Sequence, residues 1–321
     1  MLLKLTHSTD LTYSEPISES VMELRVTPRQ EQDQHRLSFN LAIGPSTTTL
    51  NYFDWLGNSV HGFTVNAFHQ QIKIVATSIV ETDPPKHDLS KSSDTWSRAP
   101  RADAFSEYDF LQFGGPIVDS PNLRDVVDQL QPRDGEPLAG LAQRMTDLIN
   151  ERFKYQPGVT TAASPITDML EHGQGVCQDF THLMIGMSRA LSIPARYVSG
   201  YLHPQSERFR GYTQTHAWCE LLFPSLGWIG FDPANRCPAN EHFVKVGIGR
   251  DFRDVPPNKG VFRGQGKETM TAQVQSDELA SVPPELAVDR MQRLAVQIYP
   301  QAARSAHRQM GLQQQDHQQQ Q

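Results

Sequence analysis

One cysteine of the sequence stands where the start of a helix would make it reactive. Cys177 follows Gly173 and Gly175, and apolar residues recur at helical spacing over residues 175–191. The first turn of a helix has unpaired backbone N–H groups and a positive dipole end. These stabilise a thiolate and can receive the oxyanion that forms when a thiolate attacks a carbonyl. A cysteine in this position is more often only a small buried residue, so Cys177 needs partners to count as a nucleophile.

Two later residues can supply those partners. His216 lies at the start of a predicted strand, residues 215–223, where alternation places it on the same face as Trp218. Asp232 ends the next predicted strand. Taken singly, His216 fits a core histidine and Asp232 fits a turn residue before proline. Together with Cys177 they provide a nucleophile, a base and a group that orients the base, which is what nucleophilic catalysis needs.

Three motifs that contain these residues closely resemble the transglutaminase-like superfamily, in particular its bacterial branch. They are G-V-C-Q-D-F, T-H-A-W-C-E and G-W-I-G-F-D-P-A-N, in that order along the chain. Residues 193–201 and 246–264 also look like parts of the core of this family, and residues 13–16 and 23–28 look like the β domain that precedes it. The resemblance covers about residues 1–80 and 136–266.

The resemblance implies an α+β fold: an N-terminal β-sandwich-like domain followed by a papain-like core, in which the helix that bears Cys177 packs on an antiparallel sheet. It implies a triad of Cys177, His216 and Asp232. Members of the family transfer the acyl group of a glutamine side chain or a peptide to an amine, or hydrolyse such bonds. The expected partner is therefore a protein or peptide substrate, and the thioester route needs no metal or organic cofactor. Calcium is not implied, because the sequence has no Asp-rich loop of the EF-hand type.

The elements that must position the triad follow from periodicity. Alternating apolar residues predict strands over residues 20–26, 36–43 and 71–80, and residues 50–55 and 60–65 flank a predicted hairpin turn. Helices are expected over residues 137–153, 175–191 and 284–298, and strands over residues 195–201, 215–223, 228–231 and 270–275.

We accordingly divide the chain into four parts. Residues 1–82 form the N-terminal β domain, and residues 83–135 form a polar linker and an acidic connecting segment, interpreted as a solvated helical surface. Residues 136–275 form the catalytic core, and residues 276–321 form a C-terminal helix followed by a disordered Gln-rich tail.

Other residues near the motifs have simpler interpretations. Strand parity points Cys219 away from His216 and into the core, and Cys237 is expected to be a loop or partly buried thiol. A zinc site of His216, Cys219, Cys237 and another ligand is the metal alternative, opposed by that parity. Trp218 is expected to pack on the site. The remaining expectations are that His182 faces away from Cys177, that Asp179 is a helix N-terminal charge, and that Arg250 and Asp251 make a structural ion pair.

Composition excludes several classes of protein. The chain has 321 residues, with 38% hydrophobic and 20% charged residues, so neither a wholly disordered chain nor a membrane protein fits. The net charge of −7 gives no basic surplus for nucleic acid. Three cysteines, an odd number, do not make a disulfide framework, so a reducing cytoplasm is the expected location.

Three functional hypotheses remain. The first is an active cysteine acyltransferase, peptidase or amidase, and the second is a papain-like scaffold that binds a protein partner while its triad is idle. In the third and weakest, glutamines of the C-terminal tail serve as the enzyme's own acyl donors, although the composition favours a simple linker.

Overall fold

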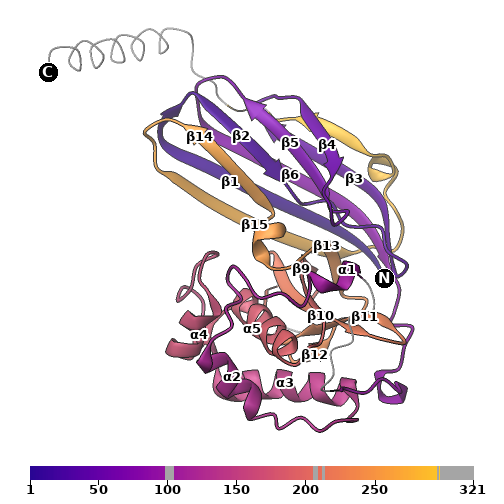
Figure 1. Cartoon of the computed structure of the whole chain (residues 1–321). Helices are drawn as coiled ribbons and strands as arrows, with labels where there is room; N and C mark the ends of the chain where they lie inside the picture. The colour runs from indigo at the N-terminus through magenta and orange to yellow at the C-terminus, as the bar shows by residue number, and fades with distance from the viewer. Residues whose placement is uncertain (98–104, 205–208, 212–213, 295, 297–321) are drawn as a thin grey trace, which may run out of the picture.

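The chain forms a β-sandwich and a helix-covered sheet that lie against each other (Figure 1). The structure, a computed structural model, describes residues 1–97, 105–204, 209–211, 214–294 and 296. No helix within those described residues has both the length and the apolar character needed to cross a bilayer. The α+β class expected from the sequence is confirmed.

The N-terminal strands build a two-sheet sandwich. One sheet has the strand order β15-β1-β6-β3-β16, and the other has the order β14-β2-β5-β4. Alternate side chains such as Leu11, Met22, Phe63 and Ile72 point between the sheets and form one apolar cluster, which is the physical result of the period-2 pattern in the sequence. The N-terminal strands are β1 (Leu2–Ile17), β2 (Glu19–Leu24), β3 (Gln34–Gly44), β4 (Thr49–Phe53), β5 (Ser59–Val65) and β6 (His69–Thr82).

Two strands that follow the core in the sequence also belong to the sandwich. Strand β14 (Asn258–Arg263) pairs with β2, and β15 (Glu268–Glu278) pairs antiparallel with β1 along almost its whole length. The strand predicted at residues 270–275 is therefore present, but its assignment to the core was wrong. Alternation in a sequence predicts a strand and does not say which sheet it joins, because pairing partners are set by tertiary contacts.

A five-stranded antiparallel sheet with the order β12-β11-β10-β9-β13 forms the centre of the core. Its strands are β9 (Ala195–Leu202), β10 (His216–Phe223), β11 (Gly227–Asp232), β12 (Cys237–Pro238) and β13 (Phe243–Gly249). The helices are α1 (Phe105–Tyr108), α2 (Pro121–Asp128), α3 (Leu138–Arg152), α4 (Ile166–His172) and α5 (Cys177–Ala190), and the short 3₁₀ turns are η1 (Leu89–Lys91), η2 (Phe252–Asp254) and η3 (Pro284–Leu286).

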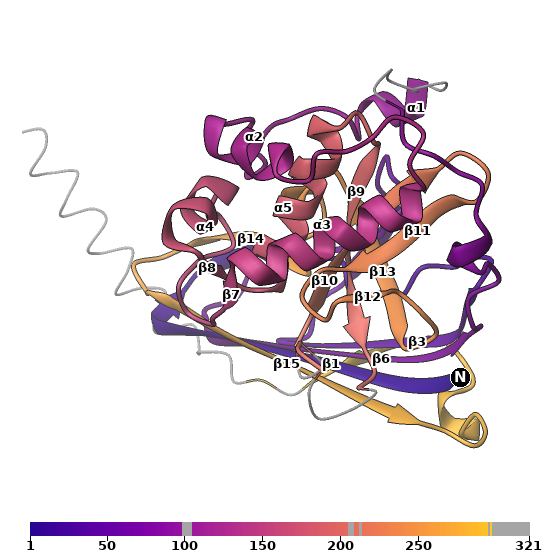
Figure 2. The ribbon, with the colours of Figure 1, turned by 90° about the horizontal axis from the view of Figure 1, so that it is seen from below.

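Helix α5 is the central element of the core. It packs on β10 and β9 and contacts α2, α3 and α4 (Figure 2). Phe180, Leu183, Ile185 and Met187 are all 0% exposed, so the helix is buried on nearly every side. A helix in that position is held by its packing more than by its intrinsic propensity, and this fixes where its N-terminal end points.

Two expectations for the flanking segments need correction. Helix α2 belongs to the acidic connecting segment, but it buries Leu123, Val126 and Val127 in the same cluster as α5 and is not only a solvated surface. The C-terminal helix predicted at residues 284–298 is absent from the described part of that range. The turn η3 is followed by β16 (Arg290–Arg293), which pairs parallel with β3. Pairing at the edge of β3 outweighs a weak helical periodicity. The Gln-rich tail lies outside the described residues.

The sandwich and the core share a buried interface. Leu3, Leu5 and Val80 of the sandwich pack against Tyr201 and Val244 of the core, with Val246 and Val274 completing the same apolar cluster. His7 Nδ1 lies 3.0 Å from the Tyr201 hydroxyl, which donates to the carbonyl of Val26. This polar contact is buried with the apolar cluster, so His7 can be neutral far more easily than charged.

Two side-chain amides of the sandwich also bracket β13, the edge strand of the core sheet. Gln34 accepts from the N–H of Lys245 and donates to its carbonyl, at 2.7 and 2.8 Å. Asn58 does the same at Ile248, at 2.9 Å for both bonds. These amides satisfy backbone groups that an edge strand otherwise leaves unpaired.

We expect the folding stability to decrease as the pH falls from 6.5 toward 4, and His7→Gln to make that decrease shallower. Burial lowers the pKa of His7 from 6.5 to about 4. Between these pH values the unfolded chain binds a proton at this site that the folded protein does not, so stability is lost on acidification. The loss amounts to at most about 3 kcal/mol for this residue. Thermal unfolding midpoints recorded across this pH range test the expectation.

His35→Gln is the matched control, because His35 is exposed and its replacement should leave the pH dependence of the midpoint as in the wild type. If the midpoint of His7→Gln fell as steeply with acid as that of the wild type, the buried interface histidine would not be a source of the acid sensitivity.

Candidate active site

The first turn of α5 is locked in place around Cys177. The Asp179 carboxylate accepts from the backbone N–H of Val176 at 2.7 Å and from the Thr160 hydroxyl at 2.6 Å. Gly175 is required here, because a Cβ at this position would lie 2.8 Å from Cβ of Asp179. Asp179, expected as a helix N-terminal charge, therefore lies in the first turn and caps the helix, and Cys177 occupies the first helical position with its side chain half-buried.

His216 and Asp232 form a closely bonded pair at the start of β10 and the end of β11. His216 Nε2 lies 2.6 Å from Asp232 Oδ2, and both side chains are 0% exposed. The second carboxylate oxygen accepts from the backbone N–H groups of Ala234 and Asn235 at 2.9 and 3.2 Å. The turn that follows β11 therefore points its N–H groups at the carboxylate and fixes its position.

Three interactions set the charge of the His216 ring. Burial, the largest effect, disfavours the charged ring, but the Asp232 carboxylate beside Nε2 and then the Cys177 thiol raise the pKa of His216 above its usual value. Since Nε2 is taken by Asp232, Nδ1 is the ring nitrogen available to the Cys177 thiol. No described atom meets the geometry of a full hydrogen bond to Nδ1, and catalytic hydrogen bonds commonly tighten only when substrate is bound.

The structure thus brings together Cys177, His216 and Asp232, the three residues singled out in the sequence. A thiol beside an imidazole, with the imidazole held by a buried carboxylate, is the arrangement that activates a cysteine nucleophile. The sulfur also lies at a helix start, where free N–H groups can bind an oxyanion.

Sequence reasoning missed several residues that complete this site. Asn235 donates to Asp232 Oδ2 at 2.7 Å, and its side-chain oxygen accepts from the N–H of Arg210 at 2.8 Å. The only available signal was its place at the end of the G-F-D-P-A-N motif. Tyr155 interacts with Cys177, and Gly211 covers the ring of His216. Neither had a signal, because both approach the site through tertiary contacts.

The other two cysteines lie on strands of the core sheet. Cys237, expected to be a loop or partly buried thiol, is half-buried on β12, where it pairs with Asp232. Cys219 packs with Ala217 and Leu221 in the cluster formed with α5, on the face of β10 opposite Trp218. Burial raises the pKa of the Cys219 thiol well above its usual range, and burial followed by the Asp232 charge raises that of Cys237 to about 12. Within the described residues, no group of three or more His, Cys, Asp and Glu side chains is arranged to hold a metal ion.

The remaining candidate residues are structural. Trp218 is 1% exposed and stacks on the His216 ring, with centroids 6.2 Å apart. His182 faces away from Cys177 and accepts from the N–H of Phe252. The predicted pairing of Arg250 with Asp251 is wrong in its partners. Arg250 binds Asp254 at 2.9 Å, and Asp251 binds Arg253 at the same distance, because both pairs close the 3₁₀ turn η2.

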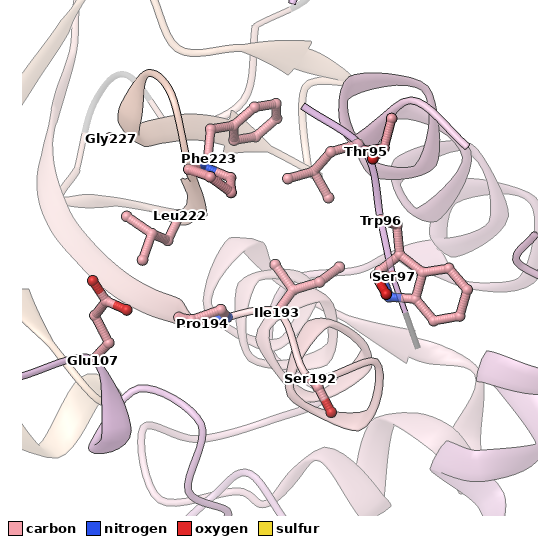
Figure 3. A pocket seen from close by; sticks show the side chains of 12 residues that line it. Thr95, Trp96, Ser97, Glu107, Ser192, Ile193, Pro194, Leu222, Phe223 and Gly227 are labelled. Atoms are coloured by element: carbon pink, nitrogen blue, oxygen red, sulfur yellow. The ribbon is translucent and has the colours of Figure 1, made fainter. Parts of the chain in front are cut away.

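A cavity of about 180 Å³ lies elsewhere in the core (Figure 3). Its walls include Trp96, Ile193 and Phe223, which lie beyond the C-terminal end of α5 and at the far end of β10. None of the triad residues lines it. The chemistry is therefore at the opposite end of α5 from this cavity.

Comparisons with known proteins agree with the motifs. The profile of the transglutaminase-like superfamily core matches residues 124–233, and that of the bacterial transglutaminase-like N-terminal region matches residues 3–81. An uncharacterized protein of Mycobacterium leprae is 32% identical over 284 residues, which cover 87% of this chain and 99% of that protein. A protein-glutamine gamma-glutamyltransferase of Pseudomonas aeruginosa is 30% identical over 125 residues, which cover 37% of this chain and 19% of that protein.

Among solved structures, a candidate cysteine protease from Cytophaga hutchinsonii has a similar fold. It matches with a TM-score of 0.71 at 23% sequence identity, and the match covers 88% of this chain and 93% of the other. Both the sandwich and the core therefore recur together in another protein.

We expect iodoacetamide to alkylate Cys177 much faster than Cys219 or Cys237, and His216→Ala to slow that reaction. The other two thiols stay protonated because burial raises their pKa values, whereas Cys177 is half-buried beside an imidazole. An unassisted thiol holds little thiolate near pH 6, so loss of His216 should slow labelling by at least about tenfold there. Peptide mass spectrometry after timed labelling measures all three rates. Equal rates in the wild type and His216→Ala would show that the pair does not activate the thiol.

We also expect Gly211→Ala to disable the site. Gly211 has φ +84°, and an added Cβ would lie 2.3 Å from His216 Nδ1, so the ring must turn away from Cys177. The labelling rate of Cys177 near pH 6 should fall toward that of His216→Ala.

Gly135→Ala is the control for backbone strain. Gly135 has φ +81° but open space around its missing Cβ. Both variants should lose about 1 kcal/mol of stability from the left-handed conformation, and only Gly211→Ala should slow labelling. Unchanged labelling in Gly211→Ala would mean that the ring has room to accept the methyl group.

Proposed function

Because the chain belongs to the transglutaminase-like superfamily, we propose that it is a cysteine enzyme that acts on amide bonds. It takes the acyl group of a glutamine side chain or of a peptide bond and passes it to an amine or to water through a thioester on Cys177. The observation that carries this proposal is the buried His216–Asp232 pair, held 2.6 Å apart, whose ring interacts with the Cys177 thiol at the start of α5. The likeness to a protein named protein-glutamine gamma-glutamyltransferase supports the same chemistry.

The cycle starts from a thiolate on Cys177 and an imidazolium on His216, a state favoured by the raised pKa of His216. The sulfur bonds to the amide carbonyl carbon, and the π electrons of the C=O bond move onto the oxygen. The C–N bond then breaks, and His216 donates its Nδ1 proton to the leaving nitrogen. Ammonia leaves from a glutamine, or an amine leaves from a peptide, and the acyl group remains on sulfur.

In the second half, His216 acts as a base. An amine or a water molecule loses a proton to Nδ1 and bonds to the thioester carbon, and the Cys177 thiolate leaves. Asp232 keeps Nε2–H bonded throughout, so that Nδ1 stays directed at the sulfur. The free N–H groups at the start of α5 bind the oxygen while it is negative. None of these steps calls for a metal or an organic cofactor.

We also propose a cytoplasmic location and a protein or peptide substrate. The three free cysteines are compatible with a reducing cytoplasm, and cell fractionation followed by immunoblotting tests the location.

The activity is measured as the release of ammonia from a glutamine-containing protein substrate such as casein. We expect Cys177→Ala to abolish this release and Asp232→Asn to slow it by about 10²–10⁴-fold. The release is measured with and without a fluorescent primary amine. Faster release together with a covalently labelled substrate identifies transfer, and release with no label under any condition identifies hydrolysis.

A complementation experiment in cells can contradict the proposal that the triad is active. If Cys177→Ala restored every phenotype of a strain that lacks the protein, the triad would be idle, and the chain would act as a papain-like scaffold that binds a protein partner.

A further inference from the structure

Tyr155 is held beside the nucleophile by a short piece of sheet. Strand β7 (Lys154–Tyr155) pairs parallel with β8 (Gln174–Gly175), the two residues that lead into α5. The N–H of Lys154 donates to Gly173, and the N–H of Gln156 donates to Gly175, at 2.9 and 2.8 Å. The backbone of Tyr155 is thus registered against the start of the catalytic helix.

The side chain of Tyr155 is fixed as well. Its ring contacts Phe180 of α5, with centroids 5.9 Å apart, and the guanidinium of Arg210 lies over the ring, 4.6 Å from its centroid. Arg210 is itself anchored, since its guanidinium donates to the carbonyl of Ala234 and its N–H donates to Asn235. Asn235 is the residue that holds Asp232, so one connected set of contacts fixes both the base and this phenol.

The phenol of Tyr155 lies beside the nucleophile, because β7 is paired with the residues that lead into α5 and the ring packs on Phe180. The Cys177 thiol and the Cys177 backbone N–H both affect the pKa of this phenol, as groups next to its hydroxyl would. When a carbonyl carbon is bonded to the sulfur, its oxygen must lie near that N–H group. The phenol is therefore next to the place where negative charge develops, in a partly buried position where a hydrogen bond is stronger than in water.

We infer that Tyr155 is a catalytic residue whose hydroxyl donates the second hydrogen bond, beside the Cys177 N–H, to the oxyanion on the substrate. This inference rests on the proposed function. No proton is transferred in this interaction. The hydrogen bond from the hydroxyl to the substrate oxygen strengthens as the C=O bond becomes C–O⁻ and weakens when the carbonyl re-forms. Burial, followed by the nearby Cys177, raises the pKa of Tyr155 to about 12, so the phenol keeps its proton at neutral pH and can donate.

Two reactions of the same sulfur test the inference. In the reaction with iodoacetamide, the Cys177 sulfur displaces iodide from a tetrahedral carbon of the reagent, and no oxyanion forms. In the reaction with p-nitrophenyl acetate, the sulfur attacks the ester carbonyl, an oxyanion forms, and p-nitrophenolate leaves. We expect Tyr155→Phe to slow acylation by about 10²–10³-fold and to leave the alkylation rate within about twofold of the wild type. Acylation is followed by p-nitrophenolate absorbance and by the acetyl mass on the Cys177 peptide.

Tyr108→Phe is the matched control, because Tyr108 is 58% exposed and should change neither rate. Equal slowing of both reactions in Tyr155→Phe would assign the hydroxyl to tuning the thiol, and faster reactions would assign it to covering the thiol. Unchanged rates in Tyr155→Phe would mean that the hydroxyl has no role in either reaction. Each of these three results would overturn the inference about Tyr155 and leave the proposed function untouched. Acylation of the wild type no faster than that of Cys177→Ala would overturn the proposed function as well.

Discussion

The site depends on keeping a charged imidazole where water does not reach it. Burial alone lowers the pKa of His216, and the Asp232 carboxylate 2.6 Å from Nε2, followed by the Cys177 thiol, raises this pKa above its usual value. Such a pair costs desolvation energy, so it is weak evidence for stability. It is stronger evidence for a functional role, since strongly perturbed groups that face a nucleophile concentrate at active sites.

The surrounding structure supplies what the carboxylate needs. Asp232 ends β11, and the turn after it presents the N–H groups of Ala234 and Asn235 and the side-chain amide of Asn235. With these donors and His216, both carboxylate oxygens are fully bonded, which is the condition for burying a charge. The same turn binds Arg210, whose guanidinium covers Tyr155. The support of the base and the walls around the nucleophile are thus one polar network.

The sequence predicted the parts of this site that local rules control. Helical periodicity after Gly175 placed Cys177 at a helix start, and strand parity placed Cys219 on the face of β10 away from His216. It did not predict Tyr155, because the register of β7 against β8 joins residues about twenty positions apart, and a two-residue strand has no pattern of its own. It also misplaced residues 258–278, since β14 and β15 return to the sandwich through pairing that no local signal encodes.

That return explains why the sandwich matters to the chemistry. Strand β15 lies along β1, and β1 carries Leu3, Leu5 and His7 into the interface with Tyr201 of β9. The sandwich also brackets β13 through Gln34 and Asn58. Strand β13 pairs with β9, and β9 pairs with β10, whose first residue is His216. A position error of about 1 Å at the base is costly for catalysis, so an edge strand held from outside the core is part of what keeps the imidazole aimed at the sulfur.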